Sequence, residues 1–318
     1  MKKTIIEAIE SYDTIFLYRH EKPDPDALGS QIGLALLITH NYPNKTVIAK
    51  GEMDDSFSFL VSEEAYRYRE TEVQEDALVI VLDTANTERI DGDGWNSGKQ
   101  LIKIDHHPEV EDYGDVMWVD TKASSTSEMI LALAMEGKES KGWEWTTEAA
   151  RLLYAGIVGD TGRFQFSNTT PTTLRLAAEA LEYPFDTTEL FTHFYENSEA
   201  LIRLKGRVLL DFELTKNGLG IAYLTQQTLK EYGVTANESS AVVNAFANTE
   251  GLKAWVFFVE EEDGTYRVRL RSKGPVIHTI AEKHNGGGHP MAAGAKVKDE
   301  AEMKEIIREL NEKCAEVV

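Results

Sequence analysis

The sequence contains little cysteine, no long apolar run and no excess of basic residues, and each shortage excludes a class of protein. The single cysteine, Cys314, excludes an internal disulfide and fits the reducing cytoplasm, where we expect the protein to act. The longest apolar run is far shorter than a membrane-spanning helix, so we expect no membrane partner. Charged residues near the N-terminus occupy the place where a secretory signal has its apolar region.

Basic residues are outnumbered throughout the chain. Lys and Arg total 33 against 54 Asp and Glu, which gives a formal net charge of −21. Such a protein will not coat long or duplex nucleic acid through a general basic surface. It could still bind a small phosphorylated substrate if metal ions and a local group of Arg and Lys made the electrostatic potential positive at one site.

The first half of the chain alternates strand-like and helical segments. Short apolar and β-branched runs predict strands at 14–18, 46–49, 77–82, 101–104 and 116–119. Amphipathic patterns between them predict helices at 4–10, 31–38, 127–135, 147–158 and 174–181. Because the unbroken apolar run at 77–82 is typical of a strand buried on both faces, we predict an α/β fold with a doubly wound, mainly parallel sheet.

The sequence changes in character from about residue 206. Strand-like runs at 219–224, 253–259 and 266–270 are mixed with helical patterns at 226–232, 239–247 and 300–315. The hairpin signals Asn217-Gly218 and Asp263-Gly264 favour a smaller α+β domain. We therefore expect a catalytic domain at 1–185, a linker at 186–205 and a substrate-binding domain at 206–318.

Carboxylate and imidazole side chains follow the predicted strands of the first domain. The set consists of His20, Asp24, Asp26, Asp83, Asp105, His106, His107 and Asp160. Because the carboxyl ends of parallel strands meet at one edge of a sheet, we expect these side chains to lie together. Such ligands, without thiolate, suit Mn²⁺ or a similar divalent ion better than structural zinc. The set is large enough for two ions with one bridging carboxylate, the usual arrangement for displacement at phosphorus.

Each member of this set has an ordinary alternative when it is taken alone. An isolated Asp is most often a helix N-cap or a turn residue, and a pair of histidines is often buried against the backbone. These alternatives weaken when eight such residues follow separate strands of one sheet. The joint pattern therefore favours a metal centre.

The loop after the first strand carries two prolines that restrict its backbone. Pro23 and Pro25 stiffen the loop and keep Asp24 out of the helical region. We expect Asp24 and Asp26 to face opposite sides, where they could serve different ions. Glycines on both sides of Asp160 should allow that residue to turn into the site.

The second domain contains a local basic group and a glycine run. Alternation along one predicted strand places four cations on one face of it: Arg267, Arg269, Arg271 and Lys273. The alternative is an edge strand protected by charge. The run Gly286-Gly287-Gly288-His289 would expose backbone N–H groups and let an anion approach closely, although it could also be a plain flexible loop.

These motifs resemble those of a known family. The segment 20–30, Asp83, Asp105-His106-His107 and Gly159-Asp160 look like the four motifs of the DHH phosphoesterases. The glycine run with His289, and Arg271-Ser272 upstream, resembles the associated DHHA1 domain. The compact two-domain chain looks most like the NrnA group of oligoribonucleases and nucleotide phosphatases.

The resemblance implies roles for individual residues. One ion would take His20 and Asp24, the other would take Asp26, His106 and Asp160, and Asp83 would bridge both. His107 would face the scissile phosphate, and Asp105 would orient the histidine pair. Substrate phosphate and base would be bound by Arg163, Arg271, Ser272, Lys273, Asn285, Gly286, Gly287, Gly288 and His289.

The resemblance also implies an activity: hydrolysis of short single-stranded RNA or of 3′-phosphoadenosine 5′-phosphate (pAp) to mononucleotides, with two divalent ions. Mn²⁺ is expected, with Mg²⁺ or Co²⁺ as alternatives, and the family suggests a homodimer. Linear pApA is an alternative substrate. Less favoured alternatives are a pyrophosphatase or polyphosphatase, a RecJ-type exonuclease, which would need a further nucleic-acid domain, and a nucleotide sensor without activity.

Overall fold

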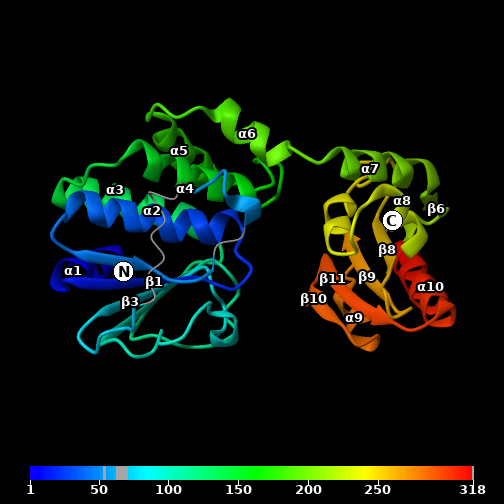
Figure 1. The fold of residues 1–318 in the computed structure, drawn as a ribbon, viewed down its shortest axis with the longest axis horizontal. Coiled ribbons are helices and arrows are strands. Elements are labelled where there is room, and N and C mark those ends of the chain that lie inside the picture. Colours follow the sequence, from blue (N-terminus) through cyan, green and yellow to red (C-terminus); the bar gives the residue numbers. More distant parts are fainter. Residues whose placement is uncertain (53–54, 62–70, 317–318) are drawn as a thin grey trace. The chain divides into compact units, whose positions relative to one another are not determined.

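The computed structural model describes residues 1–52, 55–61 and 71–316, and the chain divides into two compact units (Figure 1). The first unit is Met1–Tyr195 and the second is Glu196–Val318. The predicted linker at 186–205 is mostly helical. Helix α6 (Thr187–Tyr195) closes the first unit, and α7 (Glu199–Asp211) opens the second. Within the described residues, no helix is both long and apolar enough to cross a membrane.

A parallel five-stranded sheet forms the centre of the first unit. The strand order is β2-β1-β3-β4-β5, and every neighbouring pair is parallel. The strands are β1 (Thr14–Tyr18), β2 (Thr46–Ala49), β3 (Leu78–Leu82), β4 (Gln100–Asp105) and β5 (Val116–Val119). All five agree closely with the predicted runs, and the parallel α/β class is confirmed. All residues of β3 are buried, as its continuous apolar sequence requires.

Five of the helices described in the first unit lie on one face of this sheet. They are α1 (Lys2–Ser11), α2 (Pro25–Asn41), α3 (Thr126–Lys141), α4 (Thr147–Asp160) and α5 (Pro171–Leu181). Figure 1 shows α2, α3 and α4 as a layer against the strands, and their apolar faces share one core with alternate strand residues such as Leu17 and Ile80. The opposite strand residues, including Phe16 and Val81, pack against loop residues Ile90 and Tyr113.

A mixed six-stranded sheet forms the second unit, in the order β10-β11-β9-β8-β7-β6. The strands are β6 (Glu213–Leu214), β7 (Leu219–Leu224), β8 (Ala254–Glu260), β9 (Tyr266–Ser272), β10 (Gly287–His289) and β11 (Ala292–Val297). Helices α9 (His278–Lys283) and α10 (Glu300–Glu316) pack on one face, and α7 with α8 (Gln226–Tyr232) lies on the other. Both hairpin signals lie in turns between antiparallel strands.

Two predictions about the second unit were wrong. No strand was predicted at the glycine run, for which a plain flexible loop was the alternative, but Gly287–His289 forms β10 and pairs antiparallel with β11, which was not predicted either. The helix expected at 239–247 is only a short 3₁₀ helix, Glu238–Val242. Both errors concern short segments, where contacts distant in the sequence outweigh local preference. Two other 3₁₀ turns, η1 (Asp55–Phe57) and η2 (Thr87–Arg89), lie in the first unit.

Candidate metal centre and substrate site

The structure brings the predicted ligands together at the carboxyl edge of the parallel sheet. Three groups each place one ligand atom per residue within 4.8 Å of the others: His20, Asp24 and Asp83; Asp26, His106 and Asp160; and Asp83, His106 and His107. Asp83 and His106 are each shared between two groups. The cluster is therefore continuous, and Asp83 lies at its centre.

His20 lies two residues beyond the end of β1 and is almost completely buried. Its Nδ1 atom lies 2.7 Å from the carbonyl oxygen of Glu21. Because a carbonyl oxygen can only accept, Nδ1 carries the hydrogen of this bond. Nε2 then faces Asp24 Oδ2 at 3.8 Å and Asp83 Oδ2 at 3.4 Å. This is how a metal-binding histidine is usually oriented, with its second nitrogen fixed by a hydrogen bond.

Asp24 and Asp26 face different parts of the unit, but for a different reason from the one we predicted. Asp24 is the N-cap of α2, and its Oδ1 accepts from the N–H groups of Asp26 and Ala27 at 2.9 Å. Asp26 is not in extended backbone, because Pro25 starts the helix and Asp26 lies in its first turn. Its buried carboxylate accepts from the N–H groups of Thr126 at 2.7 Å and Ser127 at 2.8 Å.

Asp83 holds the central position through an unusual backbone conformation. Its φ of 54° lies in the left-handed region, which is uncommon for a residue other than glycine and typical of strained functional positions. Its N–H donates to the carbonyl of Ile104 at 2.9 Å. Oδ2 faces His20, while Oδ1 lies 3.5 Å from His106 Nε2 and also 3.5 Å from His107 Nδ1. The two oxygens thus face opposite halves of the cluster, as a bridging ligand must.

His106 provides the clearest test of whether the site suits a metal ion. Its Nε2 atom is buried and makes no hydrogen bond. Three carboxylate oxygens surround it, from Asp160 at 3.1 Å, Asp83 at 3.5 Å and Asp26 at 3.9 Å. Ligand atoms that converge on a point without bonding to one another are what a divalent cation requires. The nitrogen and oxygen donors fit Mn²⁺ or a similar ion.

The electrostatics of the cluster support the same interpretation. Burial raises the pKa of Asp26 well above its usual range, and the nearby Asp83 and Asp160 raise it further. Burial alone would lower the pKa of His20 and His106, but the adjacent carboxylates outweigh it and raise each to about 10. These shifts show that the buried carboxylates need positive charge beside them. A bound cation supplies such charge.

Asp105 and His107 form a separate pair at the edge of the cluster. Asp105 is fully buried, and its Oδ1 accepts from His107 Nδ1 at 2.9 Å and from the His107 backbone N–H at 3.2 Å. Burial would raise the pKa of Asp105, but these hydrogen bonds outweigh it and lower the pKa. Since Nδ1 faces Asp105, Nε2 is the ring nitrogen left for another partner. The His107 side chain is 30% exposed.

Lys103 is a residue of this site that we did not predict. Its side chain is completely buried, and Nζ donates to the carbonyls of Ala85 at 3.0 Å and Glu111 at 3.1 Å. Nζ also lies 3.9 Å from Asp105 Oδ2, and burial lowers the pKa of the lysine. The signal in the sequence was a charged residue within an apolar strand. Such a residue is rarely buried without a specific partner.

Asp160 and Arg163 differ from their predicted settings. Asp160 is the last residue of α4 and does not lie in a glycine turn. Arg163 has a φ of 63°, and its guanidinium carbon lies 3.9 Å from the centre of the Tyr195 ring. Its Nη2 also donates to the carbonyl of Phe194 at 3.4 Å. The structure thus holds Arg163 against the end of α6, and its phosphate-binding role remains a prediction.

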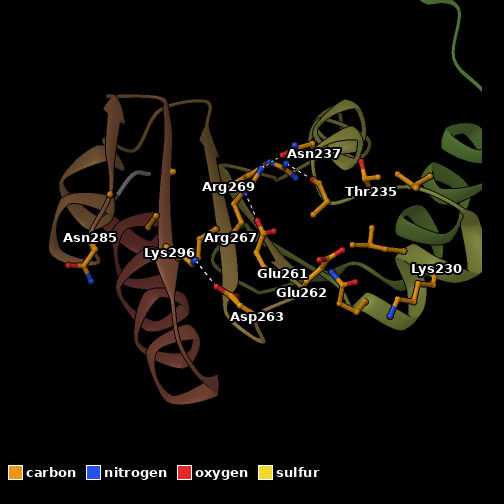
Figure 2. Close-up of a pocket in the computed structure, with 18 residues that line it drawn as sticks. Lys230, Thr235, Asn237, Glu261, Glu262, Asp263, Arg267, Arg269, Asn285 and Lys296 are labelled. Atoms are coloured by element: carbon orange, nitrogen blue, oxygen red, sulfur yellow. Dashed lines mark hydrogen bonds and ion pairs between the residues drawn. The ribbon is translucent and has the colours of Figure 1, made fainter. Parts of the chain in front are cut away.

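The basic stripe of β9 consists of Arg267, Arg269 and Arg271, and most of these side chains form contacts within the second unit. Arg269 is 9% exposed and donates to Ser239 Oγ and to the carbonyl of Ala236, both at 2.8 Å. Burial, together with the neighbouring arginines, lowers its pKa to about 10. Arg267 lies 2.7 Å from Glu261 and also bonds Asn237 (Figure 2). These two arginines therefore stabilise the fold.

Arg271 and His289 lie on the same face of the sheet. Arg271 pairs with Ala292 across β9 and β11, and Ala292 pairs with His289 across β11 and β10. Residues paired in this way point to the same side. The Arg271 guanidinium donates to the carbonyl of Leu270 at 2.9 Å. Ser272 donates to the carbonyl of Lys253, whereas Lys273 lies beyond the end of the strand and is exposed.

The three glycines of the run have different structural roles. A Cβ atom on Gly286 would lie 2.0 Å from the carbonyl oxygen of Gly294, and one on Gly288 would lie 2.6 Å from that of Ala292. These two glycines let β10 approach β11. A Cβ on Gly287 would meet nothing within 4 Å, so only this glycine leaves open space above the sheet.

A cavity of about 880 Å³ lies beside the basic stripe in the second unit (Figure 2). Its lining includes Asn285 and Gly286 from the predicted substrate site, but not Arg271, Ser272 or His289. Three cations of its lining contact nearby groups: Arg267 and Arg269 as described above, and Lys296, which lies 3.1 Å from Asp263. The predicted substrate residues are therefore not gathered in this cavity.

Comparisons with known proteins agree with this architecture. Residues 14–157 match the DHH family, N-terminal domain, and residues 219–316 match the DHHA1 domain. The chain is 50% identical over 316 residues to the "Bifunctional oligoribonuclease and PAP phosphatase NrnA" of Bacillus subtilis, covering 99% of each chain. It is 46% identical over 313 residues to the "Probable bifunctional oligoribonuclease and PAP phosphatase NrnA" of Streptococcus mutans, covering 97% of each. A solved structure of an exopolyphosphatase-related protein from Bacteroides fragilis shares the fold, with a TM-score of 0.84 at 24% identity, covering 99% of this chain and 95% of that one.

The fold, the carboxylate and imidazole cluster and these matches define a hydrolase of the phosphoesterase class. More particularly, the chain belongs to the DHH family, and its second unit is a DHHA1 domain. The resemblance that we noted in the sequence is thereby confirmed.

Proposed function

We propose that this enzyme hydrolyses short oligoribonucleotides and pAp to mononucleotides, using two divalent metal ions, with Mn²⁺ preferred. The observation that carries the proposal is the continuous cluster, in which Asp83 joins two groups of ligands. The name of the Bacillus subtilis relative, which is 50% identical over almost the whole chain, supports these substrates.

In this proposal, the residues of the cluster would form two ligand sets. His20 and Asp24 would hold one ion, Asp83 would bridge, and the second ion would be held by Asp26, His106 and Asp160. Bound divalent ions supply Lewis acidity, an activated water and neutralisation of phosphoryl charge. The chain supplies the geometry, because caps and backbone N–H groups fix the carboxylates before any ion binds.

His107 would contact the phosphoryl group. Its ring is fixed by the 2.9 Å bond to Asp105, which leaves Nε2 available to donate to a phosphoryl oxygen or to transfer a proton. Buried Lys103 holds positive charge beside Asp105 and favours the ionised carboxylate that keeps this orientation.

The second unit would bind the terminal nucleotide. The shared face of Arg271 and His289 supports a site where a guanidinium and an imidazole meet phosphate and base, beside the open space above Gly287. Ser272, Lys273, Asn285, Gly286 and Gly288 would complete or shape it, and Arg163 is the candidate phosphate contact of the first unit. The acidic chain offers no general attraction for longer strands, so substrates should be short.

A substrate panel tests the proposal. pAp, pApA, inorganic pyrophosphate and RNA from two nucleotides upward would each be incubated with Mn²⁺, and the products resolved by chromatography. Release of AMP from pAp and of mononucleotides from RNA of a few nucleotides is expected. Preference for pApA would favour the alternative substrate, and preference for pyrophosphate would refute nucleotide specificity. Absence of any hydrolysis would favour a nucleotide sensor. The homodimer implied by the family stays a prediction, which light scattering would measure.

A further inference from the structure

Arg89 occupies a turn that the backbone fixes against the metal-ligand loop. The N–H of Glu21 donates to the carbonyl of Arg89 at 2.7 Å, and His20 forms an antiparallel bridge with Ile90. One residue further on, the N–H of Asp91 donates to the carbonyl of Arg19 at 2.8 Å. All these contacts are made by the backbone of residues 19–21 and 89–91. They therefore place Arg89 beside His20 whatever the side chain of Arg89 does.

The guanidinium of Arg89 lies at this edge of the site with its donors available. Its Nη2 is 3.5 Å from His20 Nδ1, but that nitrogen already donates to the carbonyl of Glu21 at 2.7 Å. A nitrogen that carries a hydrogen toward another acceptor cannot accept from an arginine. The side chain is exposed, and no carboxylate of the residues described here lies within ion-pair distance of it. Arg89 therefore approaches a metal ligand without bonding to it.

Three other arginines described in the first unit, Arg19, Arg151 and Arg163, have a structural partner. Arg19 is fully buried and lies 2.7 Å from Asp91, and Arg151 lies 2.7 Å from Glu148. Arg163 lies over an aromatic ring. Arg89 differs because it combines exposure, a fixed backbone and contact with a residue of the candidate metal centre. In a chain of net charge −21, such a guanidinium is well placed to receive an anion.

We propose that Arg89 binds a non-bridging oxygen of the phosphoryl group that is hydrolysed at the metal centre. The inference rests on the proposed function and names a further substrate-binding residue for it. A planar guanidinium offers parallel N–H donors that match phosphate oxygens. Negative charge develops on the phosphoryl oxygens in the transition state. A positive charge fixed beside these oxygens stabilises the transition state more than it stabilises the free substrate. Arg89 would thus act on the scissile group of any substrate, whereas Arg271 would act on the terminal nucleotide alone.

The test compares Arg89→Ala with Arg271→Ala on two substrates, pAp and bis-p-nitrophenyl phosphate. Arg89→Ala should lower kcat/KM by roughly ten- to a hundredfold for both, the usual effect of losing a charge-assisted hydrogen bond to phosphate. Arg271→Ala should affect pAp only. Arg175→Ala, which removes the same charge from an exposed position on α5, should affect neither. Arg89→Lys should restore part of the activity, and millimolar guanidinium should partly rescue Arg89→Ala.

A binding measurement separates this role from support of the metal site. Calorimetric titration of the Mn²⁺-loaded protein with orthophosphate should show affinity at least tenfold weaker in Arg89→Ala, with unchanged metal content by mass spectrometry. Unchanged phosphate affinity and unchanged kcat/KM would overturn the inference. Loss of bound Mn²⁺ would also overturn it, because Arg89 would then act through His20. If the wild-type protein hydrolyses neither substrate, the proposed function fails, and the phosphate titration still decides the role of Arg89.

Discussion

The central position of Asp83 can be tested by removing its charge while keeping its shape. Asn has nearly the same volume as Asp and adopts left-handed backbone more readily than most residues, so it tolerates the φ of 54°. Its amide oxygen can still accept from Thr126 Oγ1, which bonds Asp83 Oδ1 at 3.1 Å. Asp83→Asn should therefore fold normally and lose the negative charge that both ligand groups share.

The expected magnitude follows from the shared position. Changing a residue that only supports a ligand typically weakens metal binding ten- to a hundredfold, and loss of a ligand should cost at least as much. At a metal concentration about 100 times Kd, each site stabilises the folded protein by about 2.7 kcal/mol. A hundredfold weaker Kd leaves about 0.4 kcal/mol per site. Two sites together then lose about 4.6 kcal/mol of stabilisation, or roughly 9–18 °C of the Mn²⁺-induced rise in Tm for a unit of this size.

The assay is thermal unfolding with and without Mn²⁺, combined with metal analysis of the dialysed protein. Wild-type protein should hold about two ions per chain, and Asp83→Asn should lose most of both. Asp120→Asn is the matched control, because Asp120 also follows a strand end but is exposed and belongs to none of the ligand groups. A full Mn²⁺-induced rise in Tm and full metal content in Asp83→Asn would refute the bridging role.

Three further predictions test the remaining parts of the site. His106→Ala should lower the metal content, because the Nε2 atom of His106 faces three carboxylates. His107→Ala should lower kcat and keep the metal, because His107 is held by Asp105 for contact with the phosphoryl group. Metal analysis and steady-state kinetics would show whether the two roles are reversed. Arg271→Ala should raise KM for pAp by roughly ten- to a hundredfold and keep both ions, and equal loss on a generic phosphodiester would contradict nucleotide binding. Gly286→Ala should lower Tm by several degrees, because the added Cβ would lie 2.0 Å from a carbonyl oxygen. Gly287→Ala should fold normally, because a Cβ there meets nothing within 4 Å. Equal Tm values for the two variants would contradict the packing role of Gly286.

The arrangement of the metal centre could be predicted because it follows from topology. In a parallel sheet every strand delivers its carboxyl end to the same edge, so residues such as Asp83 and His106 converge although they lie far apart in the sequence. The position of Lys103 behind Asp105 could not be predicted in the same way. It depends on which carbonyl groups lie across the sheet, and only the folded chain defines these.

The second unit was harder to predict because its strands depend on partners distant in sequence. The glycines before His289 favour a loop by local preference, yet Gly287–His289 is a strand because β11 provides hydrogen-bonding partners. Alternation along β9 correctly places its arginines on one face. It could not show that Arg269 is buried against Ser239 and Ala236, whereas Arg271 donates to the carbonyl of Leu270 within its own strand.

The two interpretations of the acidic residues in the first loop, as helix caps and as metal ligands, are not exclusive. Asp24 caps α2 through two backbone N–H groups, and Asp26 accepts the first two N–H groups of α3. The N-terminal ends of helices carry partial positive charge and unpaired donors, so they stabilise carboxylates that would otherwise repel one another. Each helix thereby fixes the position of one carboxylate and leaves the remaining oxygen lone pairs for another partner. The fold itself can therefore hold the ligand geometry in place before any metal ion binds.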